Sequence, residues 1–204
     1  MSKTMELEKY DRKEVFLHYN QNDNPFIYLT IKLDVTEIYN YCKIHKNYYA
    51  TMGYIINRTV NAVDCFKYRY IDDKIVHYDS LNTNYTQKKD NKIGYFTISY
   101  SDNYNEYIES FIKTQEDFYS GVYKNEYKED EIWVSCAPWF DFTSLVTPFN
   151  KKITIPQFIW GKFFFENNRV YTHLMIMVHH GFADGQHIGD FIDKLNNNIK
   201  EIFK

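Results

Sequence analysis

Hydrophobic and polar residues recur with recognisable periods along much of this chain. Apolar residues at helical spacing predict helices over residues 49–63, 104–118 and 188–202. Alternating or short apolar runs predict strands over residues 26–33, 66–71, 75–78, 93–100, 131–137, 153–165 and 169–178. The last two strands are separated by Glu166, Asn167 and Asn168, which is a hairpin signal. The pattern therefore predicts a protein that contains both helices and strands.

A further short helix is expected directly after the first strand. Asp34 is followed three residues later by Glu37, the spacing of a capping box, so the helix would run through Ile38 and Tyr41. Helices and strands do not alternate strictly along the chain. This order predicts an α+β, two-layer sandwich in which helices pack on one side of a mixed, largely antiparallel sheet. With only 7 Gly, 4 Pro and no linker-like stretch, residues 1–204 are expected to form one domain.

Composition and charge narrow the class of protein. The 204 residues carry a formal net charge of −3, without the basic stripe that nucleic-acid binding needs. The apolar runs are too short to span a bilayer, and the polar first ten residues do not resemble a signal peptide. The 3 Cys include no CxxC pair and are interpreted as reduced thiols. We therefore expect a soluble cytoplasmic protein with no nucleic-acid or membrane partner.

Aromatic residues make up 19% of the chain, including 20 Tyr and 16 Phe. This abundance has two interpretations, core packing or an aromatic-lined ligand pocket. Composition alone favours core packing.

The chemically richest segment is Val-His-His-Gly-Phe-Ala-Asp-Gly-Gln-His at residues 178–187, between a predicted strand and a predicted helix. The spacing of His179, His180, Asp184 and His187 would permit a metal site. Adjacent residues on a strand point to opposite faces, which disfavours a shared ion. The other interpretations are general acid–base catalysis by one histidine, or a turn of satisfied polar residues.

This segment resembles the HHxxxDG signature of the chloramphenicol acetyltransferase family. The resemblance extends over nearly the whole chain through three further stretches in the same order, at residues 11–16 (DRKEVF), 134–144 (VSCAPWFDFTS) and 161–162 (GK). It implies the α+β fold of that family. Relatives with two fused units are about twice as long, so a single unit implies a homotrimer with active sites between subunits.

The resemblance also implies roles for individual residues. His180 matches the general base that takes the proton from the acceptor hydroxyl, and Ser135 matches the hydroxyl that stabilises the oxyanion. Both substrates would bind together, so that no acyl-enzyme forms. Asp184 and Arg12 match a structural ion pair, whereas His179 would face away from the site. No metal is implied.

The substrate sites follow from the same resemblance. Acetyl-CoA, the acetyl donor, would contact Trp139, Lys162 and Tyr49. Tyr19 matches a tyrosine that touches the acceptor, and Trp133 stands in the acceptor site where several members carry a smaller residue.

The identity of the acceptor is less constrained than the chemistry. Residues 84–89 (NYTQKK) are more charged than the corresponding apolar stretch of the family, and lysines inside a pocket would weaken binding of a neutral antibiotic. The expected reaction is acetylation of a hydroxyl of chloramphenicol, which inactivates the antibiotic. The alternatives are a related acetyltransferase for another small hydroxyl compound, and a non-catalytic trimer that binds a ligand.

Overall fold

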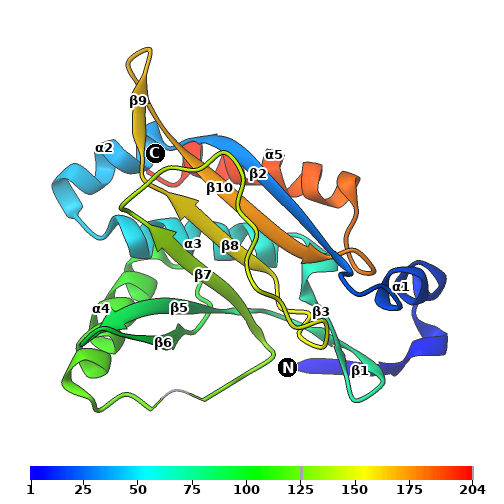
Figure 1. Cartoon of the computed structure of the whole chain (residues 1–204). Coiled ribbons are helices and arrows are strands. Elements are labelled where there is room, and N and C mark those ends of the chain that lie inside the picture. Colours follow the sequence, from blue (N-terminus) through cyan, green and yellow to red (C-terminus); the bar gives the residue numbers. More distant parts are fainter. Residues whose placement is uncertain (125, 204) are drawn as a thin grey trace.

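A seven-stranded mixed sheet organises the structure, a computed structural model that describes residues 1–124 and 126–203 (Figure 1). Its main path runs β2-β10-β8-β7-β5-β6, and β9 pairs with β10. Strand β7 is parallel to both neighbours, whereas the other pairs are antiparallel. The strands are β2 (Phe26–Asp34), β5 (Asn82–Lys89), β6 (Lys92–Ile98), β7 (Glu131–Ala137), β8 (Gln157–Gly161), β9 (Phe164–Glu166) and β10 (Arg169–His179).

A smaller antiparallel sheet has the order β1-β4-β3, with bounds Ser2–Glu6, Lys74–Tyr78 and Tyr68–Ile71. The α-helices are α1 (Lys13–Asn20), α2 (Thr36–His45), α3 (Tyr48–Asn61), α4 (Tyr104–Ser120) and α5 (Gly185–Glu201). Short 3-10 helices cover Leu7–Lys9 and Asp64–Lys67. Among the described residues, no helix combines the length and the apolar character that crossing a membrane requires.

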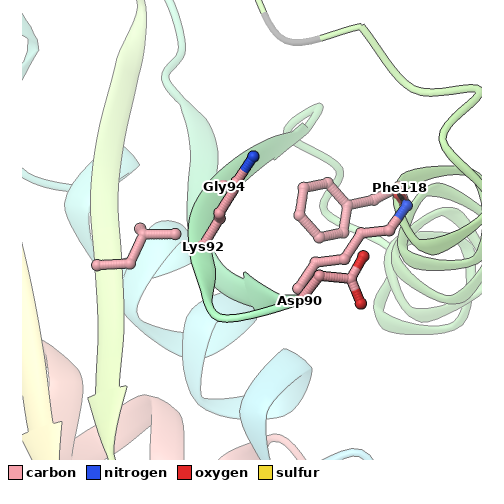
Figure 2. Close-up of a pocket in the computed structure, with 6 residues that line it drawn as sticks. Asp90, Lys92, Gly94 and Phe118 are labelled. Carbon is pink, nitrogen blue, oxygen red and sulfur yellow. Dashed lines mark hydrogen bonds between the residues drawn. The ribbon is translucent and has the colours of Figure 1, made fainter.

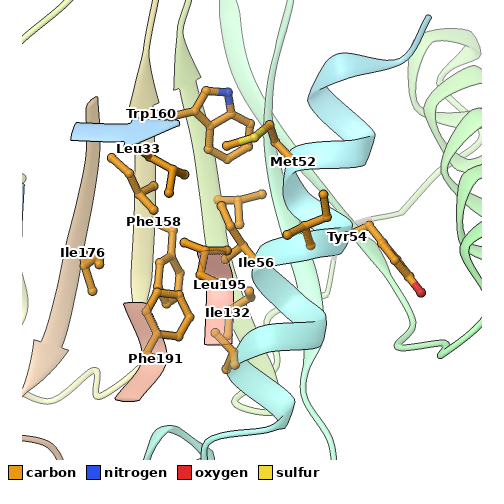
Figure 3. Close-up of a cluster of buried hydrophobic side chains, with 14 of the residues drawn as sticks. Leu33, Met52, Tyr54, Ile56, Ile132, Phe158, Trp160, Ile176, Phe191 and Leu195 are labelled. Atoms are coloured by element: carbon orange, nitrogen blue, oxygen red, sulfur yellow. The ribbon is translucent and has the colours of Figure 1, made fainter. Parts of the chain in front are cut away.

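The main core lies between the large sheet and helices α3 and α5. Figure 3 shows Met52 of α3 beside Trp160 of β8, and Phe158 of β8 beside Phe191 of α5. The rings of Phe158 and Phe191 have centroids 5.3 Å apart. Burial of such side chains contributes roughly 1.5–3 kcal/mol each. The predicted α+β sandwich, with helices on one side of a mixed sheet, is therefore confirmed.

Strand β7 shows how this packing leaves one face of the sheet free for a site. Ile132 and Val134 point into the helical layer and are fully buried. Trp133 and Ser135 alternate with them and remain partly exposed on the opposite face. The loop between β7 and β8 contributes the cover over this second face (Figure 1).

Three predicted elements differ from the structure. The strand predicted over residues 66–71 begins with the 3-10 helix, because the buried Arg69 guanidinium turns back to donate to the Phe66 carbonyl. The strand predicted over 153–165 begins only after Pro156, which cannot donate to a ladder, and is divided into β8 and β9. Helix α2 has Val35 rather than Asp34 at its N-cap, although the Asp34 carboxylate accepts from the Thr36 amide at 3.0 Å.

The hairpin at 166–168 forms as predicted. Asn167 and Asn168 adopt positive φ values of 49° and 61°, which asparagine tolerates better than most residues. Strand β5 was not predicted, since its Asn, Thr, Gln and Lys residues carry no apolar alternation. Pairing with β6 and β7 on its two sides holds it in the sheet.

Candidate active site

The two adjacent histidines at the end of β10 have different environments. His179 is 2% exposed and packs against Phe16 of α1, with ring centroids 5.3 Å apart. Its Nδ1 accepts a hydrogen bond from the Gly181 amide at 3.1 Å. Burial, with a smaller effect of His180, lowers the pKa of His179 to about 4. His179 is thus a neutral packing residue whose ring contacts Phe16, whereas the ring of His180 contacts Tyr19.

The turn after His179 depends on a glycine. A Cβ added to Gly181 would lie 2.7 Å from Cδ2 and 2.9 Å from Cα of Phe16. The second of these contacts is with backbone and cannot be relieved by rotating a side chain. Gly181 therefore permits the close approach of α1 to the turn that holds His180.

His180 lies at the rim of a hollow between α1 and the start of α5. Its ring is stacked on Tyr19, with centroids 3.6 Å apart and planes 8° apart, and its amide donates to the Pro25 carbonyl at 2.8 Å. Nδ1 is buried and has no hydrogen-bond partner among the described residues. The hollow measures about 450 Å³ and is lined by Arg12, Glu14, Val15, His18, Tyr19, His180 and Asp184.

The predicted ion pair between Arg12 and Asp184 joins two segments, distant in sequence, at this hollow. Arg12 Nη1 lies 3.0 Å from Asp184 Oδ2, across 172 residues of sequence. Asp184 is also the N-cap of α5, accepting from the Gln186 and His187 amides, and the His187 ring lies 2.8 Å from its Oδ1. Burial opposes ionisation, but hydrogen bonds from Arg12 and His187 hold the pKa of Asp184 at about 2. Asp184 is therefore ionised, and its carboxylate holds the turn between β10 and α5 in place.

The described residues contain no group of three or more His, Cys, Asp or Glu side chains arranged to hold a metal ion. The side chain of His179 is buried among aromatic rings, and Asp184 is occupied by Arg12. The arrangement gives no support to the interpretation of this segment as a metal site.

Ser135 and Trp133 line a different cavity, of about 660 Å³, on the open face of the sheet. Its lining residues are Asn84, Thr86, Ile93, Tyr95, Tyr127, Glu131, Trp133, Val134, Ser135, Thr147, Pro148, Gln157 and Ile159. None of these residues lines the hollow at His180. The chain therefore places the two predicted catalytic residues, His180 and Ser135, in separate hollows.

The predicted acetyl-CoA residues are only partly brought together. Trp139 is 73% exposed, and the Lys162 amide donates to the carbonyl of the neighbouring Phe140 at 2.9 Å. Tyr49 instead packs against Trp160 at 5.4 Å, and its hydroxyl donates to the Thr86 carbonyl at 2.7 Å. Burial raises the pKa of Tyr49. Tyr49 thus joins α3 to the sheet and remains partly exposed.

Lys88 and Lys89, which were expected to weaken binding of a neutral acceptor, do not line the 660 Å³ cavity. Lys88 is exposed, and Lys89 donates from Nζ to the Phe118 carbonyl at the end of α4, at 3.3 Å. Figure 2 shows the shallow hollow beside this contact, at the turn between β5 and β6, with Gly94 opposite the Phe118 ring. Neither Lys88 nor Lys89 therefore places its charge in the lining of the cavity that contains Ser135.

Sequence reasoning missed five polar or aromatic residues of the 660 Å³ cavity: Tyr95, Tyr127, Glu131, Thr147 and Gln157. For Glu131 a signal was available, since alternation along β7 places it on the same face as Trp133 and Ser135. Gln157 becomes a neighbour only because β8 lies parallel to β7.

Known proteins resemble this chain in sequence and in fold. A chloramphenicol acetyltransferase from Staphylococcus aureus is 30% identical over 97% of this chain and 96% of its own length. A solved chloramphenicol acetyltransferase superposes with a TM-score of 0.82 at 21% identity, covering 98% of this chain and 100% of that one. A probable dihydrolipoamide acetyltransferase from Listeria monocytogenes shares the fold, with a TM-score of 0.74, 13% identity and coverage of 93% and 89%. The family profile described as chloramphenicol acetyltransferase matches residues 2–196. By this match and by its fold, the chain belongs to the chloramphenicol acetyltransferase family.

Proposed function

We propose that this protein transfers the acetyl group of acetyl-CoA to a hydroxyl of chloramphenicol. Membership of the family identifies an acetyltransferase, for which acetyl-CoA is the implied donor. The observation that carries the assignment of His180 is its position: the imidazole borders an open hollow, stacked on Tyr19 beside the Arg12–Asp184 ion pair.

His180 acts as general base in this proposal. Nδ1 is buried, so Nε2 is the ring nitrogen available to accept the proton of the acceptor hydroxyl. The acceptor oxygen attacks the thioester carbonyl carbon, and the carbonyl electron pair moves to oxygen. Collapse of this tetrahedral intermediate breaks the C–S bond, and the departing thiolate of coenzyme A takes the proton from His180. Both substrates are bound together, and no acyl-enzyme forms.

Ser135 stabilises the tetrahedral intermediate by donating its hydroxyl to the oxyanion. A donor in that position contributes on the order of 3 kcal/mol to catalysis. His180 and Ser135 must then act on the same substrate, although they occupy separate hollows of one chain. We therefore propose a homotrimer, in which Ser135 of one subunit faces His180 of the next. The separation of these two residues within the chain supports that arrangement.

Trp139 and Lys162 are the proposed contacts of coenzyme A. Trp139 offers an exposed flat surface for the adenine ring, and Lys162 offers a cation for phosphate. Tyr19 and Trp133 would contact the acceptor from the two sides of the subunit boundary.

A second candidate is acetylation of another small hydroxyl compound. A specific observation favours keeping it: the cavity of Ser135 contains the carboxyl group of Glu131, which an apolar antibiotic does not need. A third candidate, a trimer that binds a ligand without catalysis, does not explain why the ion pair, the half-buried imidazole and Ser135 are all present.

The deciding experiment measures thiol release from acetyl-CoA, with and without chloramphenicol, for the wild type and His180→Ala. Thiol release that requires chloramphenicol and is lost in the variant supports His180 as the base, acetyl-CoA as the donor and chloramphenicol as the acceptor. Release from wild type with other hydroxyl compounds alone would move the proposal to the second candidate. Equal release by the wild type and His180→Ala would remove His180 from its role.

A further inference from the structure

The cavity that contains Ser135 has chemically different ends along one strand. Glu131, Trp133 and Ser135 are alternate residues of β7 and all line the cavity. Because a strand rises about 3.3 Å per residue, the backbone of Glu131 lies about 13 Å from that of Ser135. That span is the length of a small aromatic molecule whose reacting hydroxyl lies at Ser135.

The middle of the cavity is aromatic. The rings of Trp133 and Tyr127 stand edge to face, with centroids 6.4 Å apart and planes 74° apart. Both residues are partly or largely exposed and line the cavity. Their surfaces can hold a flat ring of a substrate between the two ends.

Glu131 closes the far end and is the single charged residue in the described lining of this cavity. It is 1% exposed. The Thr97 hydroxyl donates to Glu131 Oε1 at 2.6 Å, and Asn84 Nδ2 in turn donates to the Thr97 hydroxyl at 3.1 Å. This chain of hydrogen bonds holds the carboxyl group in one orientation before any substrate enters.

A carboxyl group fixed in this way still has acceptor capacity. The two oxygens offer about four lone-pair sites, of which Thr97 and Asn84 use two. No lysine, arginine or histidine lines the described cavity to neutralise the group. Burial raises the pKa of Glu131, with smaller opposing effects from Thr97 and Asn84. The carboxyl group accepts hydrogen bonds in its ionised form and, through its carbonyl oxygen, in its protonated form.

We infer that Glu131 selects acceptors whose end remote from the reacting hydroxyl carries a hydrogen-bond donor, such as an amine or a second hydroxyl. The inference rests on the proposed function for the identity of this cavity as the acceptor site. A nitro group at that end has acceptors only, so its oxygens would face the carboxyl group without a hydrogen bond. An amine on the same ring would pair with it.

The matched probes are chloramphenicol and its arylamine analogue, in which the nitro group is reduced to an amine. Equilibrium binding of each is measured alongside turnover, so that recognition is seen even without catalysis. A hydrogen bond to a charged group predicts that the wild type binds the amine about tenfold more tightly or better. Glu131→Leu should abolish that preference, and Glu131→Gln, which can still accept from Thr97, should retain part of it. Glu116→Gln on the exposed face of α4 removes the same charge elsewhere and should leave the preference unchanged.

The outcomes separate the two proposals. Binding with the expected preference but without thiol release would overturn the proposed function and leave the inference standing. Equal binding of the two probes by the wild type, or an unchanged preference in both Glu131 variants, would overturn the inference while activity remained. Should Glu131→Leu fail to fold, the wild-type preference and the Glu131→Gln comparison decide.

Discussion

The imidazole of His180 lies parallel to the phenol ring of Tyr19, with centroids 3.6 Å apart. Tyr19 belongs to α1, and His180 follows β10, so the stack aligns two segments that are distant in sequence. Tyr19 was predicted from sequence as an acceptor contact. The structure adds a second role, because the stack limits rotation of the imidazole.

Replacing Tyr19 tests that positioning role. Tyr19→Ala should lower kcat/KM by about two- to tenfold beyond any change in acceptor binding, since an aromatic pair contributes about 0.5–1.5 kcal/mol. Tyr19→Phe keeps the stack and should retain kcat. Steady-state kinetics with varied acceptor separate kcat from KM. If the Ala and Phe variants showed the same kcat, the stack would have no positioning role.

Ser135→Ala tests the oxyanion donor. We expect kcat to fall by about 10²-fold or more with little change in KM, because the hydroxyl acts on the intermediate and not on the bound substrates. Ser144→Ala, at an exposed position in the following loop, is the matched control and should behave like the wild type. An increase in KM with unchanged kcat would instead assign Ser135 to substrate binding.

Mixed oligomers test whether the site lies between subunits. His180→Ala and Ser135→Ala are each expected to be nearly inactive alone. Co-expression should restore part of the activity, because some boundaries then join an intact His180 to an intact Ser135. Light scattering should show three chains per particle. Absence of any restoration in a confirmed mixed trimer would place both residues of each site on one chain.

Asp184 offers a test of the structural ion pair. Asp184→Ala removes the N-cap of α5 and should lower the free energy of unfolding by about 1–2 kcal/mol. Asp184→Asn keeps a cap but loses the charge opposite Arg12. It should therefore lose less stability than Asp184→Ala, and its loss of activity should exceed its loss of stability. Denaturant unfolding and thiol release are measured on both variants. Equal stability of the two variants would show that the cap contributes little.

Buried His179 makes stability depend on pH. Its folded pKa of about 4 lies below the unfolded value near 6.5, so the unfolded chain binds the proton first. Stability should therefore be complete above about pH 6.5 and fall as the pH is lowered toward 4, by a total on the order of 3 kcal/mol. His179→Asn should make the free energy of unfolding less dependent on pH in this range, while keeping an acceptor for the Gly181 amide. Unfolding curves from pH 4 to 7 provide the test, and equal slopes for both proteins would contradict it.

Sequence by itself determined the elements whose signal is local. Strand β7 has the bounds predicted from its alternation, and α3, α4 and α5 follow the predicted apolar spacing closely. Helices α4 and α5 each bury one face, whereas α3 is buried on most sides. The residues able to do chemistry were also visible, since the segment at 178–187 and the motifs around Arg12 and Ser135 are short and ordered along the chain.

Only the tertiary structure decided what depends on contacts between distant segments. Polar strand β5 exists because β6 and β7 pair with it, and Tyr49 is tied to the sheet because the Thr86 carbonyl accepts its hydroxyl. Folding also separated Ser135 from His180 and placed Glu131 at the far end of the same cavity as Ser135. Periodicity assigns a residue to a face of its own strand. Which strands and loops surround that face is set by long-range pairing and packing.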